Sequence, residues 1–466
     1  MCACRARAKR FFSISDSPES IRLPATETLL TTPDIERMFS GAQRIQRMLD
    51  FEAALAVAQY EAGLISAAAR DAIAACCRAD RFDADMLLNS AHSAGNAAIP
   101  LVSALTKAVE AQNPAASAWV HWGATSQDVL DTGMILQLRE ACDLIVAQLK
   151  SAESRLAQLV VHHLHTPMVA RTLLQQASAT TLGYKLAIWG HGLERARLGL
   201  QALHQDAFAI QLGGAVGTLS VLGADAATIR QSAARHLGLA VPAMTWHVQR
   251  DRMRAIGAAM VDAVMACAKP ATDLMLMMQS EVSEAMESAV SAGGSSAMPN
   301  KRNPVRALVP VAAAANASGL LAALFNNAVH EHERAAGAWH GEWFALPQLA
   351  AMAHASASAM ADIVGSIAFL PARMRSNLES GGGLVAAEAL TAALAKGSGK
   401  IAARKLVERL CDEVRAGGGS LAERAAAMPE LGRQLGEQGM AAVFNHDDAI
   451  EAAARAAKSW LDQREA

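Results

Sequence analysis

The sequence has few aromatic residues and almost no strand-forming pattern. Only 4% of its 466 residues are Phe, Trp or Tyr, although 52% are hydrophobic, so alanine, leucine, valine and methionine must form the core. Alternating β-branched runs are nearly absent, whereas apolar residues recur at helical spacing through much of the chain. Small side chains at this frequency favour helices that approach one another closely. The composition therefore predicts an all-α fold.

Cysteine is scarce, and its spacing argues against a metal site. No cysteines show paired CxxC zinc spacing, and their number is odd: the seven stand at positions 2, 4, 76, 77, 142, 267 and 411. In a chain of this length, the pattern is typical of free, mostly buried thiols. It indicates a reduced, cytoplasmic protein.

Neither sign of charge is in excess. The formal net charge is −2, which gives no overall attraction to nucleic acid or to an anionic membrane, so neither is expected as a partner. Basic residues do cluster in residues 1–25, MCACRARAKRFFSISDSPESIRLPA, but no apolar segment of signal-peptide length follows them. We interpret this stretch as a disordered basic tail, with a transit peptide as the alternative.

One uncharged stretch raises the question of a membrane. Residues 307–329 carry no charge and are long enough to span a bilayer. The stretch nevertheless contains Pro310 and several amide or hydroxyl side chains, and much of its apolar content is alanine. We therefore favour a helix that is buried on all sides in a bundle, and expect no membrane partner.

The clearest helical pattern predicts one unusually long helix. Apolar residues recur at spacings of three and four along a heptad seam formed by Ile135, Leu138, Cys142, Ile145, Leu149, Ala152, Leu156 and Leu159. Thr125 and Ser126 mark the start, and Asp128 and Asp131 in the first turns suit the helix dipole. A helix from there to about Leu164 would be roughly 55 Å long at ~1.5 Å per residue. Such a length predicts a long bundle shared between subunits.

The remaining patterns predict further helices and three helical domains. Helices are expected at about 249–292 with a kink at Pro270, at 303–327 and at 346–369. No internal repeat of fixed period is present. After the tail of residues 1–25, the predicted domains are an N-terminal helical domain at 26–125, a central long-helix bundle at 126–370 and a C-terminal helical domain at 371–466.

The stretch GGSSAMPNKRNP, residues 293–304, interrupts the helical pattern and presents reactive groups. Its glycines end the preceding helix, and its prolines bias the residues before them to extended conformations. Between them lie the Ser295 hydroxyl, the Lys301 ammonium and the Asn303 amide. These groups suit a carboxylate substrate and a proton transfer from carbon. By composition alone, a plain interhelical linker explains the stretch equally well.

This stretch resembles the signature GSSxMPxKxNP of the fumarase/aspartase superfamily at all eight fixed positions. HWGATSQDVLDT, residues 121–132, and RTLLQQASATTLG, residues 171–183, resemble two further blocks of that superfamily in the same order. The resemblance covers nearly the whole chain from about Leu29. It implies a homotetramer in which the three blocks, from different subunits, meet at each active site.

The resemblance also implies roles for three residues. In this superfamily a base removes the proton from the carbon α to a carboxylate, and nearby cations and amides stabilise the resulting aci-carboxylate. Matched by motif, Ser295 is the group that exchanges the proton with carbon. Lys301 and Asn303 stabilise charge on the substrate carboxylate. Since a serine hydroxyl is a weak base at neutral pH, its oxyanion must be stabilised by loop amides and a cation.

The second block departs from the common pattern of the superfamily. Members that release fumarate or an amine have a histidine where this chain has Leu173, and the following Leu174, Gln175 and Gln176 do not titrate either. That histidine helps a poor leaving group to depart. A carboxylate, with a pKa near 4, needs no such help. The change therefore points to lactone chemistry, in which the substrate's own carboxylate adds and leaves.

Four other stretches resemble the bacterial 3-carboxy-cis,cis-muconate cycloisomerases: SAGNAAIPLV, QLGGAVGTL, WHVQRDRM and HERAAGAWHGEW, which begin at residues 93, 211, 246 and 332. This resemblance implies reversible closure of a muconate tricarboxylate to 4-carboxymuconolactone, in protocatechuate breakdown on the β-ketoadipate route. In relatives, a tryptophan fills the position of Leu173 and a histidine often fills that of Gln176, and the sequence leaves open how these two departures affect substrate positioning.

The remaining candidates for substrate binding have structural alternatives. A helix N-terminus attracts carboxylates, but Thr125 and Ser126 could also only cap the helix. His121 could orient a carboxylate or close its loop, and Arg334 and His332 could contact a tricarboxylate or remain solvated. The resemblance adds Asn96, Thr172 and Gln175 to the substrate-binding set. Arg302 and Arg306 are either charges behind the site or surface ion pairs.

No cofactor and no metal are expected. His162, His163 and His165 have no carboxylate within one helical turn, and we interpret them as a polar helix end. The glycines at 213–217 and the stretch at 397–400 lack the strand and helix context of a nucleotide site.

Two other functions remain open. The chain could be another lyase of the superfamily, such as an adenylosuccinate or argininosuccinate lyase, although the absent histidine argues against both. It could also be an inactive helical scaffold, against which the intact Ser295, Lys301 and Asn303 argue.

Overall fold

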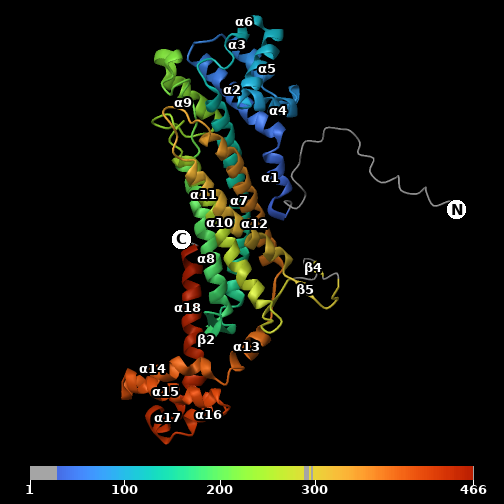
Figure 1. Ribbon diagram of the computed structural model, residues 1–466. Coiled ribbons are helices and arrows are strands. Elements are labelled where there is room, and N and C mark those ends of the chain that lie inside the picture. The colour runs from blue at the N-terminus through green and yellow to red at the C-terminus, as the bar shows by residue number, and fades with distance from the viewer. Residues whose placement is uncertain (1–28, 288–292, 295–296, 465–466) are drawn as a thin grey trace, which may run out of the picture.

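A computed structural model describes residues 29–287, 293–294 and 297–464. The basic tail and Ser295 lie outside these residues, and for Gly293 and Gly294 only the backbone is described. The described chain is predominantly helical, which confirms the predicted all-α class. Its helices form an elongated bundle with smaller groups of helices at the two ends (Figure 1).

The N-terminal part contains α1 (Pro33–Met38), which lies beside α12, and five further helices towards one end of the molecule: α2 (Gly41–Glu61), α3 (Ala67–Cys76), α4 (Ala84–Ala94), α5 (Ala98–Gln112) and α6 (Pro114–Ser117). Local capping explains where several of them begin. Ser40, Ser66 and Asp83 each accept a hydrogen bond from a backbone N–H in the first turn of the helix that follows. Helix α2 then packs on the central bundle.

The central bundle is built from α7 (Ser126–His162), α8 (Leu182–Ala202), α10 (Asp251–Met277), α11 (Val305–Asn326) and α12 (Ala338–Ser366), with α9 (Ala226–Leu237) beside α2. The predicted long helix is confirmed in α7. Its seam from Ile135 to Leu156 is fully buried, whereas Leu159 is only partly covered. This apolar seam packs against α8 and α12, and its burial stabilises the bundle.

The C-terminal part contains α13 (Pro371–Glu379), α14 (Ala387–Ser398), α15 (Lys400–Arg415), α16 (Leu421–Ala426), α17 (Pro429–Phe444) and α18 (Asp447–Arg464). Helices α14 to α17 share an apolar cluster of their own. Helix α18 instead returns to pack along α8 (Figure 1). The last helix of the predicted C-terminal domain therefore contacts the central bundle, and the three-domain division stays a prediction.

Two predicted helix boundaries were wrong. The helix expected to reach residue 292 ends at Met277, because the chain turns at 278–284 and the Glu284 N–H bonds to the Met277 carbonyl. The helix expected from 346 begins earlier, at Ala338, and continues through Pro347. The first departure reflects tertiary contacts, because no glycine or proline in the sequence marks the end of that helix.

The chain also forms a β-hairpin that the sequence did not indicate. Strands β1 (Pro167–Thr172) and β2 (Gln175–Thr181) pair antiparallel, with a bulge between Val169 and Arg171. The turn between them consists of Leu173 and Leu174, both with positive φ, where Asn or Gly is usual. The remaining strands are two residues each: β3 (Ala285–Met286) pairs with β6 (Ala368–Phe369), and β4 (Gly293–Gly294) with β5 (Arg302–Asn303).

Helix α11 is not buried on all sides within one chain, so its burial in a bundle shared between subunits stays a prediction. Helices α10 and α11 are both long and apolar enough to cross a membrane. The most apolar segment of α11 is only 22% buried in the chain, whereas that of α10 is 56% buried. Leu308 and Phe325 are among its exposed apolar side chains. One face of α11 therefore remains uncovered in the single chain.

Candidate functional site

The start of α7 is fastened to a glycine loop by one buried carboxylate. Asp128 accepts hydrogen bonds from the backbone N–H groups of Thr125 (3.0 Å), Gly213 (2.9 Å) and Gly214 (2.9 Å). Its side chain is fully buried. The acidic residue that the sequence placed in the first turn thus fixes the conformation around Thr125 and Ser126.

The glycines at 213–217 are explained by close packing rather than by nucleotide binding. Gly214 has a φ of +71°, and a Cβ there would lie 2.9 Å from the carbonyl oxygen of Gly123. Only glycine permits this approach without displacing the neighbouring backbone. The loop after residue 213 is thereby held directly against the turn that leads into α7.

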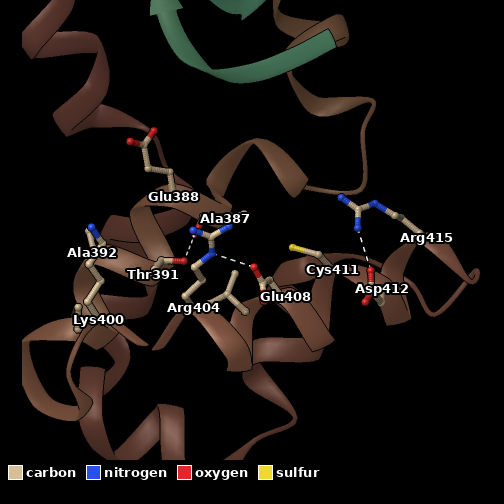
Figure 2. Close-up of a pocket in the computed structure, with 12 residues that line it drawn as sticks. Ala387, Glu388, Thr391, Ala392, Lys400, Arg404, Glu408, Cys411, Asp412 and Arg415 are labelled. Carbon is tan, nitrogen blue, oxygen red and sulfur yellow. Dashed lines mark hydrogen bonds and ion pairs between the residues drawn. The ribbon is translucent and has the colours of Figure 1, made fainter. Parts of the chain in front are cut away.

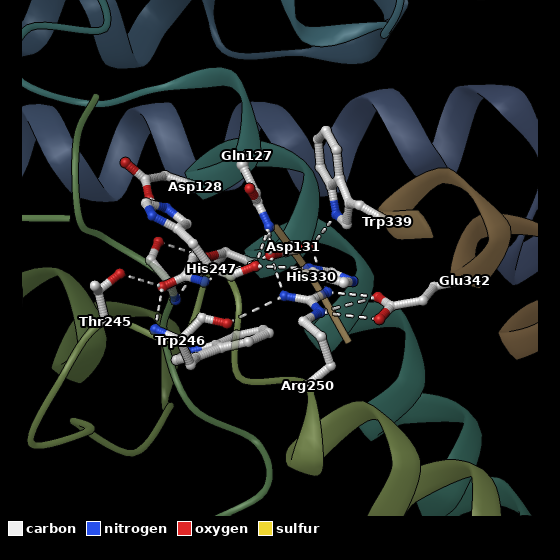
Figure 3. A network of polar contacts seen from close by, with 12 residues as sticks. Gln127, Asp128, Asp131, Thr245, Trp246, His247, Arg250, His330, Trp339 and Glu342 are labelled. Atoms are coloured by element: carbon white, nitrogen blue, oxygen red, sulfur yellow. Dashed lines mark hydrogen bonds and ion pairs between the residues drawn. The ribbon is translucent and has the colours of Figure 1, made fainter. Parts of the chain in front are cut away.

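Behind this turn lies a buried network of charged side chains that sequence reasoning did not identify (Figure 3). Arg250 forms paired hydrogen bonds to Asp131 (2.7 and 3.0 Å) and contacts both oxygens of Glu342 (2.5 to 3.2 Å). Trp339 donates to Asp131 at 2.8 Å, and Gln127 donates to it at 3.1 Å. The network joins α7, the start of α10 and α12, behind the turn that leads into α7.

The network is electrostatically paired. Burial alone would lower the pKa of Arg250, but Asp131 and Glu342 raise it above its ordinary value, so the guanidinium stays charged. Burial raises the pKa of Glu342, and Arg250 opposes that rise. A second buried pair lies beside it, because His247 Nε2 is 2.7 Å from Asp128 Oδ1. These groups lie behind the start of α7 and are too buried to meet a substrate directly.

Arg334 is brought to the start of α7, as a carboxylate-binding residue requires. Its guanidinium donates to the Ala215 carbonyl at 2.9 Å and to Gln127 Oε1 at 3.4 Å. His332 lies in the same loop, exposed and with a φ of +45°. His330, which the sequence did not single out, contacts the network instead, with Nδ1 3.3 Å from the His247 carbonyl. Arg334 is therefore the better placed of the two predicted residues.

His121 is paired with a buried carboxylate. Its Nδ1 is 2.6 Å from Glu52 Oε1, and the Glu52 side chain is only 1% exposed. Burial alone would lower the pKa of His121, but the charge and hydrogen bond of Glu52 raise it above its ordinary value of 6.5. His121 adopts a φ of +59° in the turn before α7. It therefore closes the loop, and it can also offer positive charge near the helix start.

The raised pKa of His121 predicts a pH-dependent contribution to stability. A raised folded-state pKa stabilises the fold fully below the unfolded pKa, about 6.5, and this stabilisation is lost as pH rises through the folded pKa. We expect His121→Gln to lower the melting temperature most at pH 6 and progressively less towards pH 8. Thermal scans of both proteins across this range check the trend, and a constant or widening difference would contradict it.

Asn96 is used at least partly for capping. Its Oδ1 accepts hydrogen bonds from the N–H groups of Ala98 (3.0 Å) and Ile99 (3.3 Å), at the start of α5. The neighbouring Gly95 carbonyl lies 3.1 Å from His340 Nε2, in the first turn of α12. Asn96 thus lies at the same end of the bundle as Thr125, with its oxygen already occupied.

The signature loop is closed at its base by a short antiparallel pair. Gly293 pairs with Asn303, and Gly294 with Arg302, which brings the two ends of the loop together. Lys301 is exposed, and Asn303 is half-buried. Of the two alternatives for the neighbouring arginines, Arg306 forms a surface ion pair with Asp362, whereas Arg302 contacts the Met286 sulfur at 3.3 Å.

The predicted substrate-binding residues of the second block lie at the tip of the hairpin. Thr172 and Gln175 flank the turn, and both are exposed. Leu173 and Leu174 are 97% and 77% exposed. Two leucines in the left-handed region are strained, at a cost of roughly 1–2 kcal/mol each. A strained, exposed apolar turn is typical of a segment that contacts something beyond its own chain.

Within one chain the candidate residues form three separate groups. His121, Thr125, Ser126, Asn96 and Arg334 lie at one end of the bundle, near the start of α7. Strands β4 and β5 lie at the side of the bundle, and the hairpin lies near its other end, next to α13 (Figure 1). A single chain therefore does not bring the three sequence blocks together.

A cavity in the C-terminal part lies away from the predicted site. It has a volume of about 900 Å³, lies between α14 and α15, and contains none of the predicted site residues (Figure 2). Its two arginines are already paired, Arg404 with Glu408 and Arg415 with Asp412, each at 2.8 Å. Burial raises the pKa of its Cys411 thiol. Among the described residues, no group of His, Cys, Asp and Glu could hold a metal ion.

Comparison with known proteins identifies the family. Residues 30–319 match a family model described as lyase. The chain is 42% identical over 422 residues to a 3-carboxy-cis,cis-muconate cycloisomerase of Bradyrhizobium diazoefficiens, covering 90% of this chain and 94% of that protein. It is 43% identical over 386 residues to the Pseudomonas putida protein of the same name, covering 83% and 92%.

A solved structure agrees with these sequence matches. The crystal structure of 3-carboxy-cis,cis-muconate lactonizing enzyme from Pseudomonas putida has a TM-score of 0.85 and 38% sequence identity to this chain. The match covers 94% of this chain and 98% of the other. The chain belongs to the fumarase/aspartase superfamily of lyases, in the group that contains the 3-carboxy-cis,cis-muconate cycloisomerases.

Proposed function

We propose that this protein is a 3-carboxy-cis,cis-muconate cycloisomerase, an intramolecular lyase that reversibly closes 3-carboxy-cis,cis-muconate to 4-carboxymuconolactone. The observation that carries this proposal is the similarity of nearly the whole chain to enzymes of that name. In the closing direction, a carboxylate oxygen of the substrate adds to one carbon of a double bond. A proton is added to the adjacent carbon.

Ser295 is the proposed proton donor to carbon in closure and the proton acceptor in the reverse reaction. Lys301 and Asn303, at the base of the same loop, are proposed to stabilise the aci-carboxylate that forms when carbon is deprotonated. The β4–β5 pairing supports this role, because it fixes Asn303 opposite Gly293, two residues before the serine. After donating its proton, the serine oxygen is reprotonated from solvent.

A carboxylate of the substrate is proposed to bind at the start of α7. The backbone N–H groups at a helix N-terminus and its dipole attract anions, and Asp128 already fixes the conformation of Thr125 and Ser126. Arg334 adds a positive charge at the same place. His121, Asn96 and His332 complete the proposed set, with His121 and Asn96 also serving the structural roles described above.

The hairpin is proposed to contribute Thr172 and Gln175 to the substrate site without an acid for the leaving group. From Leu173 to Gln176 no side chain can donate a proton at neutral pH. A leaving carboxylate needs none, since it departs as a stable anion. This absence argues against adenylosuccinate and argininosuccinate lyase activity, in which the leaving group is a much stronger base.

A homotetramer is proposed as the working assembly. The uncovered apolar face of α11 and the exposed Leu173–Leu174 turn both call for a partner surface. The three separate groups of site residues can also form one active site only if more than one chain contributes to it. Sedimentation equilibrium should return four times the mass of one chain, 48.8 kDa, and a monomer at micromolar concentration would contradict this proposal. We place the enzyme in the cytoplasm, on the protocatechuate branch of the β-ketoadipate route.

The activity is tested by following the conjugated-diene absorbance of 3-carboxy-cis,cis-muconate in the ultraviolet after adding purified protein. We expect catalysed loss of this band until the equilibrium with the lactone is reached. Adenylosuccinate and argininosuccinate serve as parallel substrates. Turnover of either in place of the muconate would replace the proposed function with that of another lyase, and no turnover by a correctly assembled tetramer would favour the scaffold alternative.

A further inference from the structure

The tip of the β1–β2 hairpin has little packing of its own. From Thr172 to Gln176 every side chain is exposed. The turn residues Leu173 and Leu174 have φ angles of +50° and +65°. Within the chain, the contacts that can set the position of Thr172 and Gln175 therefore lie at the base of the hairpin, where the chain meets the bundle.

Arg171 makes the strongest of these contacts. It donates two parallel hydrogen bonds to Glu284, at 2.7 and 2.9 Å, and the Glu284 side chain is fully buried. Paired guanidinium–carboxylate bonds fix direction as well as distance. The bulge between Val169 and Arg171 locally changes the strand register, as bulges that re-aim a side chain do.

Glu284 is itself fixed by three contacts from two other elements, α10 and α13. Its N–H bonds to the last turn of α10 at Met277 (2.8 Å), and its carbonyl accepts from Leu370 at the start of α13 (2.9 Å). Its Oε1 also accepts from the Asn377 side chain at 2.9 Å. Asn377 also contacts the hairpin directly, because its backbone carbonyl accepts a longer hydrogen bond from the Gln176 side chain, at 3.4 Å. Both strands of the hairpin are thus tied to one buried carboxylate and its neighbour.

These anchors flank the predicted substrate-binding residues. Arg171 precedes Thr172, and Gln176 follows Gln175. We propose that Arg171 and Glu284 are a positioning pair: they hold the hairpin so that Thr172 and Gln175 reach the substrate correctly. The inference rests on the proposed function, because those two contacts with substrate are part of it. Neither member of the pair touches the substrate.

The central test compares Arg171→Lys with Arg197→Lys. Lysine keeps the charge but cannot form the paired bonds. Arg197 is a matched control, because it pairs with the buried Glu153 at 2.8 Å between α8 and α7, away from the hairpin. We expect Arg171→Lys to raise KM for the muconate about tenfold with kcat changed about twofold or less, because a misplaced binding residue weakens substrate binding. Arg197→Lys should leave both constants close to wild type.

Hydrogen exchange of the backbone amides at 167–181 provides a readout that does not depend on activity. Arg171→Lys should speed exchange in this segment about tenfold, the factor that corresponds to 1.4 kcal/mol of lost local stability. Arg197→Lys should not change it. Glu284→Gln should reproduce both effects of Arg171→Lys, and the double variant should be no worse than either single one, because all three break the same contact.

Each outcome is decisive. Faster exchange together with a higher KM supports the positioning role. Faster exchange with an unchanged KM would mean that the pair holds the hairpin but does not position substrate contacts, and unchanged exchange would overturn the inference altogether. If the wild-type enzyme does not turn over the muconate, the proposed function fails, and the exchange result alone decides whether the pair fixes the hairpin.

Discussion

Replacing Ser295 with alanine should reduce turnover of 3-carboxy-cis,cis-muconate by about 10²- to 10⁴-fold, the range that a positioned proton-transfer group contributes. Alanine removes the hydroxyl that exchanges the proton with carbon and leaves the rest of the signature intact. The initial rate of loss of diene absorbance, at saturating substrate and in both directions, measures the effect. Because only the chemical step is removed, KM should change much less than kcat.

The neighbouring Ser296 provides the matched control for this variant. Ser296→Ala removes an identical group from the same loop and should cost far less activity. Sedimentation must show that both variants keep the mass of the wild-type assembly. If Ser295→Ala keeps more than about a tenth of wild-type activity, or if the large loss follows Ser296 instead, the proton-transfer assignment is wrong. The fold and the family would be unaffected.

Replacing Arg250 with methionine should lower the free energy of unfolding by about 3–5 kcal/mol, the cost of leaving buried charges without their partner. The guanidinium is fully buried, and Asp131 and Glu342 are only 3% and 4% exposed. Methionine fills much of the volume but leaves both carboxylates uncompensated in a low-dielectric environment. Urea titration followed by circular dichroism measures the loss.

Arg235→Met is the control, because Arg235 pairs with Glu61 at the surface and is 64% exposed. An exposed pair contributes about 0–1 kcal/mol, so this variant should unfold close to wild type. Neutralising the acids as well, in Arg250→Met with Asp131→Asn and Glu342→Gln, should recover part of the loss. Equal effects of Arg250→Met and Arg235→Met would show that the buried network is not needed for stability.

The Arg250 variant should also affect substrate binding, because the network lies directly behind the start of α7. Asp131 receives hydrogen bonds from Gln127 and Trp339 as well as from Arg250, and Gln127 contacts Arg334. Loss of Arg250 therefore frees groups that fix the proposed carboxylate site. Structural and functional effects at this end of the bundle are coupled through shared hydrogen bonds.

Several features followed from the sequence because they depend on local patterns. The spacing of apolar residues from Ile135 to Leu156 determined the long helix α7, since a repeated apolar stripe has one way to be buried. The eight fixed positions between Gly294 and Pro304 identified the superfamily. The absence of a titratable side chain from Leu173 to Gln176 indicated the type of leaving group. This inference needs only the identity of the residues and not their positions in space.

Other features depended on contacts between residues far apart in the sequence. The stretch WHVQRDRM did not indicate that Arg250 would be buried between Asp131 and Glu342. A buried charge is stable only when partners from other parts of the chain reach it, and local sequence does not show those partners. The end of α10 at Met277 and the Leu173–Leu174 turn contradict local propensity for the same reason: Arg171 and Asn377 bind Glu284 and hold both segments in place. Local sequence therefore determined the long helix α7 and the residue types in the three blocks, whereas tertiary structure decided which charges are buried together, where α10 ends and where the hairpin lies.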